Sequence, residues 1–252
     1  VFAFAASALV LWWAFSTGRA SLSRGQSGRG GRALLIAAIA YVCVTSGPIA
    51  VYSRVLFSAH VLLSVLAMVL VGFPLSLLVG DARIRRLAAQ PVWLRVLLGL
   101  VPAALLSGGY LPSAVLRRIL ESHPANVGFV LTCIAAGLLW GMLVRASTMT
   151  APSSAVREAG SLTRVIPAVV AGAGVAAFGL YLSWTATVLV PSWFGATGRT
   201  WIADASGDQH RAGWVLVALA VGVVAVAFDA VTRSRATRPA ELAPGKEKPG
   251  TT

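Results

Sequence analysis

Long apolar runs alternate with short polar connections along the whole chain. A helix that crosses a membrane needs about 20 mostly apolar residues. Seven such runs occupy residues 1–18, 33–53, 55–80, 92–111, 125–144, 165–190 and 212–231. They predict an all-α fold, a polytopic membrane helical bundle of about seven transmembrane helices within a single domain, residues 1–232. The remainder, 233–252, is rich in proline and charge, which predicts a disordered cytoplasmic tail.

The composition agrees with this pattern and excludes a soluble domain. Hydrophobic residues make up 57% of the chain, charged residues only 12%, and the mean hydropathy is +0.80. Soluble domains carry roughly 25% charged residues. The lipid bilayer is therefore the predicted surrounding. Nineteen of the 21 basic residues are arginine, a bias typical of a GC-rich bacterial genome, so the predicted location is the bacterial inner (plasma) membrane.

The net charge of +13 would suggest nucleic acid in a soluble protein, but its distribution indicates membrane orientation instead. Fifteen basic residues lie in one set of alternating connections and the tail: Arg19, Arg24, Arg29, Arg32, Arg83, Arg85, Arg86, Arg145, Arg157, Arg164, Arg233, Arg235, Arg238, Lys246 and Lys248. Five lie in the other set: Arg54, Arg117, Arg118, Arg199 and Arg211. Because basic loops stay in the cytoplasm, the N-terminus is predicted outside and the C-terminus inside, with no nucleic acid as partner.

The three histidines all fall near the predicted extracytoplasmic side. His60 lies about two turns into the third run, His123 opens the fifth, and His210 precedes the last beside Asp208. Imidazole binds copper, zinc and iron, so His60, His210 and Asp208 are candidate metal ligands, with His123 as a fourth. The alternative reading makes His60 a hydrogen-bonded core residue and His123 a solvated helix start.

No catalytic signature accompanies these residues. The chain has no HExxH, GxSxG or phosphate-loop motif, and it is predicted not to be an enzyme. No predicted span holds a central charged residue, which argues against a polar transport path. Cys43 and Cys133 lie inside apolar runs and are predicted to be small buried side chains.

Two stretches resemble the CtaG-type cytochrome c oxidase assembly proteins. Pro48 and Tyr52 precede Phe57-Ser58-Ala59-His60 at the start of a leucine-rich helix, and Asp208-Gln209 is followed by Gly213-Trp214. The resemblance implies a helper for assembling a haem–copper oxidase that assists copper delivery on the extracytoplasmic side. It implies a copper ion as cargo, and oxidase subunits or another copper-handling membrane protein as partners. His60 would be the retained member of the family's histidine motif.

Three positions depart from the family pattern. Ser64 stands where a second histidine follows one helical turn after the first, Ala168 lies where another histidine is frequent, and His210 replaces a second glutamine. Two alternatives therefore stay open: a copper or small-solute transport protein, and a structural partner of another membrane protein that no longer binds metal. The chain opens at Val1 inside an apolar run. This start is compatible with a piece of a longer fusion, as in actinobacterial relatives with a preceding copper-resistance-D type domain.

Overall fold

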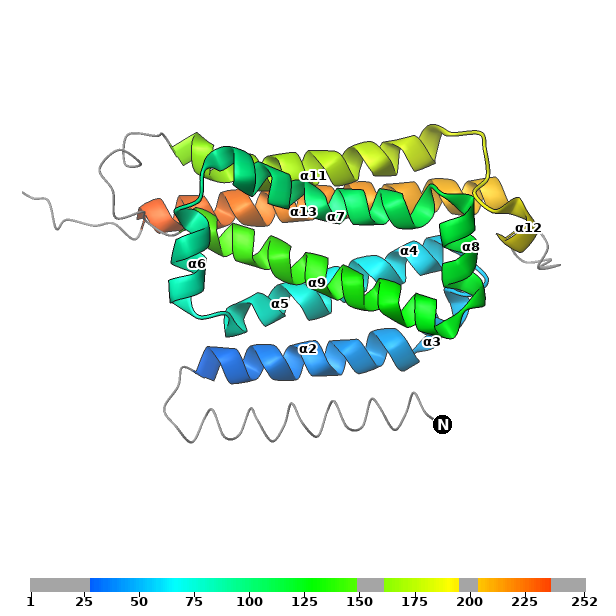
Figure 1. The fold of residues 1–252 in the computed structure, drawn as a ribbon, viewed down its shortest axis with the longest axis horizontal. Helices are drawn as coiled ribbons and strands as arrows, with labels where there is room; N and C mark the ends of the chain where they lie inside the picture. The colour runs from blue at the N-terminus through cyan, green and yellow to red at the C-terminus, as the bar shows by residue number, and fades with distance from the viewer. Residues whose placement is uncertain (1–27, 149–160, 195–203, 237–252) are drawn as a thin grey trace, which may run out of the picture.

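The computed structural model describes residues 28–148, 161–194 and 204–236, and within these ranges it is helical without strands. Its long helices run side by side along the length of the molecule (Figure 1). In chain order the elements are α2 (Gly28–Ser46), α3 (Pro48–Tyr52), α4 (Phe57–Leu66), the π-helical η1 (Ala67–Gly72), α5 (Phe73–Leu75), the 3₁₀ turn η2 (Ser76–Leu78), α6 (Asp81–Ala88), α7 (Val92–Tyr110), α8 (Ser113–Glu121), α9 (His123–Thr148), α11 (Ser161–Trp184), α12 (Pro191–Phe194) and α13 (Ala205–Ala236).

Five of the described helices are long and apolar enough to cross a membrane. They cover Phe57–Leu78, Val92–Tyr110, His123–Thr148, Val165–Trp184 and Ala205–Asp229. The all-α, polytopic prediction is thus confirmed for the described part of the chain, and five of the seven predicted spans have their counterparts. The predicted first span, 1–18, lies outside the described residues, as does residue 237 onward. The predicted start of the disordered tail at residue 233 was wrong, because residues 233–236 continue helix α13.

The second predicted span, 33–53, was wrong as one uninterrupted helix. It is divided into α2 and α3 at Gly47, which is extended with φ −85° and ψ −179°. Pro48 opens α3 and has no N–H to continue the preceding hydrogen-bond ladder. The apolar part of α2, Gly31–Ser46, is consequently shorter than the five spans.

Two other predicted ends also differ, and side chains explain both. The sixth span does not reach residue 190, because α11 ends at Trp184 and the Gln209 side chain hydrogen-bonds the following backbone at Thr187 and Leu189. The last helix begins at Ala205 instead of residue 212. Asp204 caps it by accepting the Ser206 N–H at 3.0 Å.

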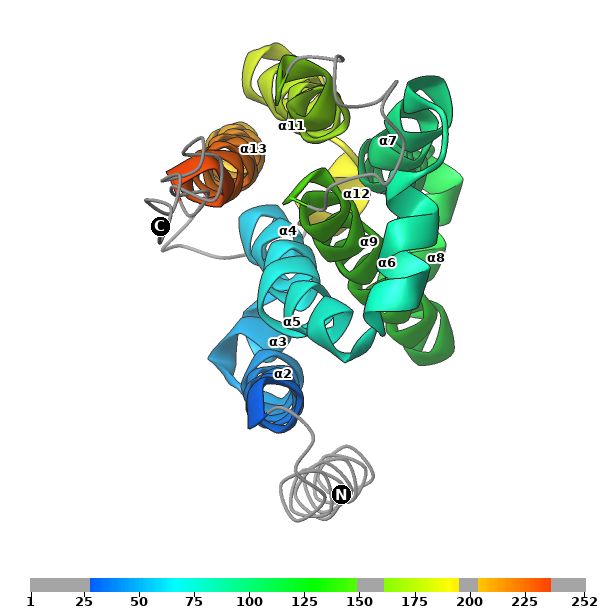
Figure 2. The same cartoon turned by 90° about the vertical axis from the view of Figure 1, so that its left-hand side faces the viewer.

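The segment from α4 to η2, which we call the central span, packs between α2, α9 and α13 (Figure 2). Glycines allow its backbone to approach α9 very closely. A Cβ atom added at Gly137 would lie 2.7 Å from the Met68 Cα atom, and one added at Gly72 would lie 3.0 Å from the Gly137 Cα atom. Small residues permit such contacts between membrane helices, where no hydrophobic effect drives association.

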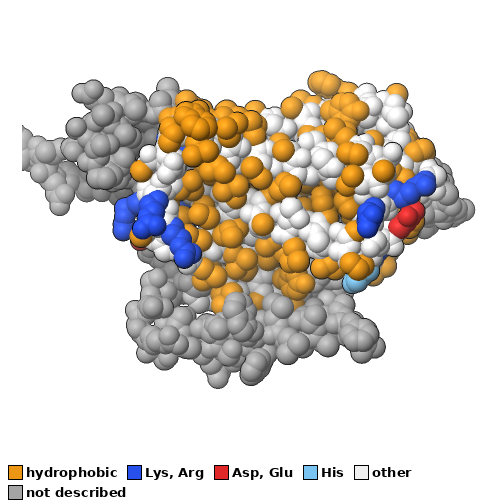
Figure 3. Space-filling view, viewed as in Figure 1, with side chains coloured by type: hydrophobic (Ala, Val, Ile, Leu, Met, Phe, Trp, Pro, Cys, Tyr) orange, Lys and Arg blue, Asp and Glu red, His pale blue; other side chains and the backbone are white. Residues whose placement is uncertain are grey.

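Two short helices lie across opposite ends of the bundle, α6 at one and α8 at the other (Figure 1). Each buries apolar side chains toward the bundle, Ile84 from α6 and Leu116 and Leu120 from α8. Figure 3 shows arginines at both ends with a mainly apolar surface between them. The two predicted sets of basic connections therefore lie at opposite ends of the bundle, wherever the structure describes them. The inward or outward direction stays a prediction from the charge count.

Candidate functional site

His60 is buried in the core near the α8 end of the bundle. Its side chain lies in the first turn of α4 and is 1% exposed. Neither ring nitrogen makes a hydrogen bond of ordinary geometry, although the Ser53 backbone interacts with the imidazole. Phe129 of α9 stacks on the imidazole with ring centroids 6.0 Å apart, and Tyr110 of α7 meets it edge-on at 5.7 Å. Buried polar atoms are nearly always paired, and His60 has two such atoms without a hydrogen bond of ordinary geometry, so this imidazole defines the candidate site.

A second polar group adjoins His60 on the same helix. The Ser64 hydroxyl donates to the His60 carbonyl at 3.1 Å and lies 2.8 Å from the Tyr110 hydroxyl. The Cys133 thiol of α9 is fully buried in the same core as Tyr110. The Tyr110 phenol of α7 thus meets Ser64 one helical turn after His60 on α4.

Asp208 holds the start of the helix that carries His60. Leu56, at the N-cap position of α4, supplies no side-chain cap. Instead the buried Asp208 carboxylate, from α13, accepts the Phe57 N–H at 2.6 Å, the Ser58 N–H at 3.3 Å and the Ser58 hydroxyl. A carboxylate at a helix N-terminus satisfies free N–H groups and complements the helix dipole. The structure therefore gives Asp208 a positioning role toward the His60 helix.

The other predicted ligands lie apart from this core. His123 is exposed at the first residue of α9, and His210 is half-buried, its carbonyl accepting the Ser183 hydroxyl at 3.4 Å. Across the described ranges no three His, Cys, Asp or Glu side chains come together as a metal site. The described residues therefore contain no metal site built from three of the predicted ligands. Metal binding by a single one of these residues stays a prediction.

Side chains of the connecting segments close this end of the bundle over His60. Trp193 of α12 donates its indole N–H to the Arg54 carbonyl at 2.9 Å, and the Arg54 guanidinium donates to the Leu120 carbonyl of α8. Phe194 packs edge-on against Phe57 with ring centroids 5.4 Å apart. The arrangement keeps water away from the imidazole.

Asp204 lies at the surface, just before α13. The Gly207 N–H and the Ser206 hydroxyl hold the pKa of the Asp204 carboxyl below its usual range.

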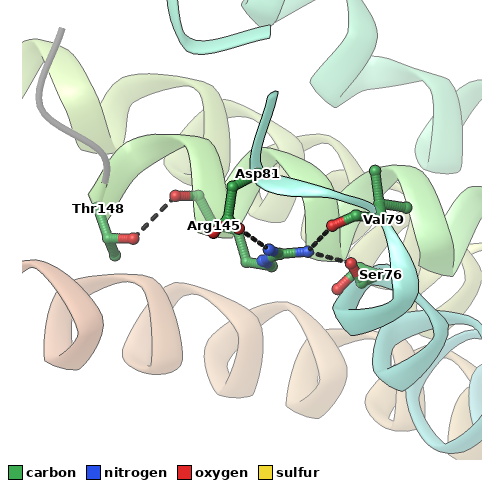
Figure 4. A network of polar contacts seen from close by, with 5 residues as sticks. All are labelled: Ser76, Val79, Asp81, Arg145 and Thr148. Atoms are coloured by element: carbon green, nitrogen blue, oxygen red, sulfur yellow. Dashed lines mark hydrogen bonds and ion pairs between the residues drawn. The ribbon is translucent and has the colours of Figure 1, made fainter. Parts of the chain in front are cut away.

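The opposite end of the central span is held by Arg145 of α9 (Figure 4). Its guanidinium donates to the carbonyls of Ser76 and Val79, the latter at 2.9 Å, and pairs with Asp81 at 2.8 Å. A cation at a helix C-terminus satisfies free carbonyls and complements the dipole. Asp208 at one end and Arg145 at the other thus fix the helix that carries His60.

Replacing Arg145 by glutamine is expected to destabilise the protein by about 1–2 kcal/mol, because the carbonyls of Ser76 and Val79 lose a charged donor. Lysine should recover only part of the loss, since a point charge cannot reproduce the guanidinium fork. Thermal unfolding in detergent measures both variants. Arg118→Gln, an exposed arginine on α8, is the control, and an equal loss there would contradict the assignment.

Sequence reasoning missed several residues of this site. Tyr110 was not predicted as a site residue. Cys133 was predicted as a small buried side chain and is buried, whereas the same prediction for Cys43 was wrong, because that side chain is exposed on α2. A usable signal was present in Gly108-Gly109-Tyr110, because Gly109 admits the Phe129 ring against α7. The capping by Asp208 had no local signal, since its target lies about 150 residues away along the chain.

The fold and the site together define the class: a multispan helical membrane protein with a buried histidine near one end of the bundle. The model of the cytochrome c oxidase caa3 assembly factor family matches residues 11–236, and the chain belongs to this family. Comparisons with curated proteins and with solved structures find no match.

Proposed function

We propose that this protein helps to assemble a haem–copper oxidase by holding a copper ion at His60 before the ion passes to the oxidase. The observation that carries the proposal is the buried imidazole, whose ring nitrogens make no hydrogen bond of ordinary geometry. Burying such a group without a full partner costs free energy, and a metal ion bound at one ring nitrogen would offset the cost at that atom, with the Ser53 backbone as the neighbour of the imidazole. The protein acts as a carrier and positioning factor without catalytic turnover, in keeping with its family.

The donors around His60 suit copper better than harder ions. Imidazole and thiolate bind Cu(I), whereas magnesium and calcium prefer oxygen ligands. His60 would supply the imidazole, and Cys133, buried in the same core on α9, is a candidate sulfur donor that would have to lose its proton on binding. Phe57, Tyr110 and Phe129 keep the surroundings dry. Two protein donors leave the ion weakly enough held to be passed on, which suits copper as cargo.

The location and partners follow from the topology. We place the chain in the bacterial plasma membrane with its N-terminus outside, so that the His60 end faces the extracytoplasmic side. Oxidase subunits, or another copper-handling membrane protein, would then receive the ion there. His210 and His123, at the same end, are candidate entry ligands that contact copper before it reaches His60.

His60→Ala is expected to lower the copper content and activity of the assembled oxidase about tenfold, because the ion loses its imidazole ligand. Copper per haem in oxidase purified from cells carrying each variant measures this effect. Cys133→Ser should act in the same direction, while Cys43→Ser, at an exposed cysteine on α2, serves as matched control. Unchanged oxidase copper in a His60→Ala strain with normal protein level would contradict the metal role.

A second candidate is a structural partner that binds no metal. Ser64 favours it, because its hydrogen bond to Tyr110 fills the position where the family has a second histidine. This candidate predicts that deletion abolishes the oxidase while the purified protein takes up no copper. Transport is less favoured: the buried charged side chains of the described spans, Arg95 and Asp208, lie near the ends of their helices.

A further inference from the structure

The end of the bundle opposite His60 carries a basic helix that lies across it. Helix α6 packs inward through Ile84, which is fully buried, whereas Arg83, Arg85 and Arg86 are exposed. At about 100° per residue, the three guanidinium groups spread over the arc of the helix that points away from Ile84. Figure 3 shows this basic cluster at the edge of the apolar surface.

Charge balance distinguishes this helix from its counterpart at the other end. The single acid of α6, Asp81, is engaged by Arg145 at 2.8 Å, and within the described ranges Arg83, Arg85 and Arg86 make no ion pair. On α8, in contrast, Arg117 lies 3.8 Å from Glu121 and donates to the Ser192 hydroxyl at 2.7 Å. Among the described residues, Arg83, Arg85 and Arg86 of α6 therefore carry positive charge that no described ion pair offsets.

The neighbouring residues place this charge at the level of lipid head groups. Val92 and Trp93 begin α7 directly after the connection from α6, and the Trp93 side chain is 63% exposed. Tryptophan concentrates at the boundary between water and lipid. Because α6 lies across the bundle end and Trp93 follows it closely in the chain, we expect the three arginines at the depth of phospholipid phosphates.

We propose that α6 is a binding site for anionic phospholipid, with Arg83, Arg85 and Arg86 holding the phosphates of the adjacent leaflet. Guanidinium binds phosphate through paired hydrogen bonds, and basic residues near a bilayer surface attract anionic lipid. The site would hold the α6 end of the protein against the leaflet that carries the anionic lipids. It is independent of His60 and of copper.

The test compares two double variants of the full chain. Wild type, Arg85→Gln/Arg86→Gln and Arg117→Gln/Arg118→Gln are purified in detergent with phosphatidylglycerol and phosphatidylcholine of identical acyl chains. Native mass spectrometry then counts the bound lipids. The α6 variant is expected to lose its preference for phosphatidylglycerol about tenfold, and the α8 variant to retain it. Salt at 0.5 M should weaken the wild-type preference, since screening acts on exposed charges (roughly 3–10 Å Debye length in this range).

Three outcomes would overturn the proposal: no preference for phosphatidylglycerol in the wild type, an equal loss in both double variants, or displacement of the lipid by free glycerol phosphate at millimolar concentration. Because the substituted side chains are exposed, we expect unchanged thermal unfolding in both variants. A spin-labelled phosphatidylglycerol in vesicles gives a second reading that does not depend on detergent. Loss of immobilised lipid in the α6 variant alone would support the site.

Discussion

Gly137→Ala is expected to destabilise the protein by about 3 kcal/mol or to prevent its accumulation. The added Cβ would lie 2.7 Å from the Met68 Cα atom and against the Met68 carbonyl. The obstacle is backbone, which cannot rotate away as a flexible side chain does. The central span and α9 must separate, and overpacking of this kind costs about 1–3 kcal/mol and occasionally more.

The same helix provides the matched control for this prediction. A Cβ added at Gly128 meets nothing within 4 Å, so Gly128→Ala should be neutral or slightly stabilising, because alanine favours helix over glycine. Unfolding by denaturing detergent, followed by circular dichroism, measures both variants. Similar stability of the two would contradict the close packing of the central span on α9. Gly72→Ala should not add its full effect to Gly137→Ala, since both alter one contact.

Asp208→Ala is expected to cost about 3 kcal/mol of stability. The buried Phe57 N–H loses its acceptor, as do the Ser58 N–H and hydroxyl, and the N-terminus of α4 loses its compensating charge. Hydrogen bonds to charged groups contribute about 1.5–3 kcal/mol, and a favourable dipole interaction up to about 2 kcal/mol. Thermal unfolding in detergent measures the loss.

Asparagine at this position separates hydrogen bonding from charge. Asp208→Asn retains an acceptor oxygen of the same shape, so we expect about half the loss of the alanine variant. The control is Asp204→Ala, which removes an exposed cap from α13 alone and should have a smaller effect. An Asp208→Ala protein as stable as wild type would show that the capping contact has no energetic weight. If Asp208 were instead a copper ligand, its substitution would lower copper binding without altering stability.

The candidate site could be predicted from the sequence only in part. His60 was found because histidine is scarce in this chain and its apolar surroundings make a buried imidazole noticeable. Its burial could follow from the pattern, but the absence of hydrogen bonds of ordinary geometry could not, because partners come from other helices. Tyr110 and Cys133 were not assigned a function, since α7 and α9 meet α4 only through the packing of the bundle.

Some helix ends could be predicted from the residue at the end, whereas others depend on a side chain from another helix. Pro48 marks its break by chemistry that belongs to the residue itself, although the break at Gly47 was not predicted. The end of α11 at Trp184 depends on Gln209, a side chain from another helix that takes up the freed backbone groups of Thr187 and Leu189. An apolar run gives no sign of such a contact.

The sequence by itself determined that this chain is an all-α membrane protein, and it indicated the family that residues 11–236 confirm. The hydrophobicity of a segment and the charge of a loop set the free-energy cost of placing that segment in lipid or in water. Membrane helices can therefore be predicted segment by segment from the sequence. Only the tertiary structure decided what surrounds His60, and that Asp208 and Arg145 hold the two ends of its helix. Those contacts join residues roughly 70 to 150 positions apart; a sequence pattern reports neighbours three or four residues away, not partners brought together by packing.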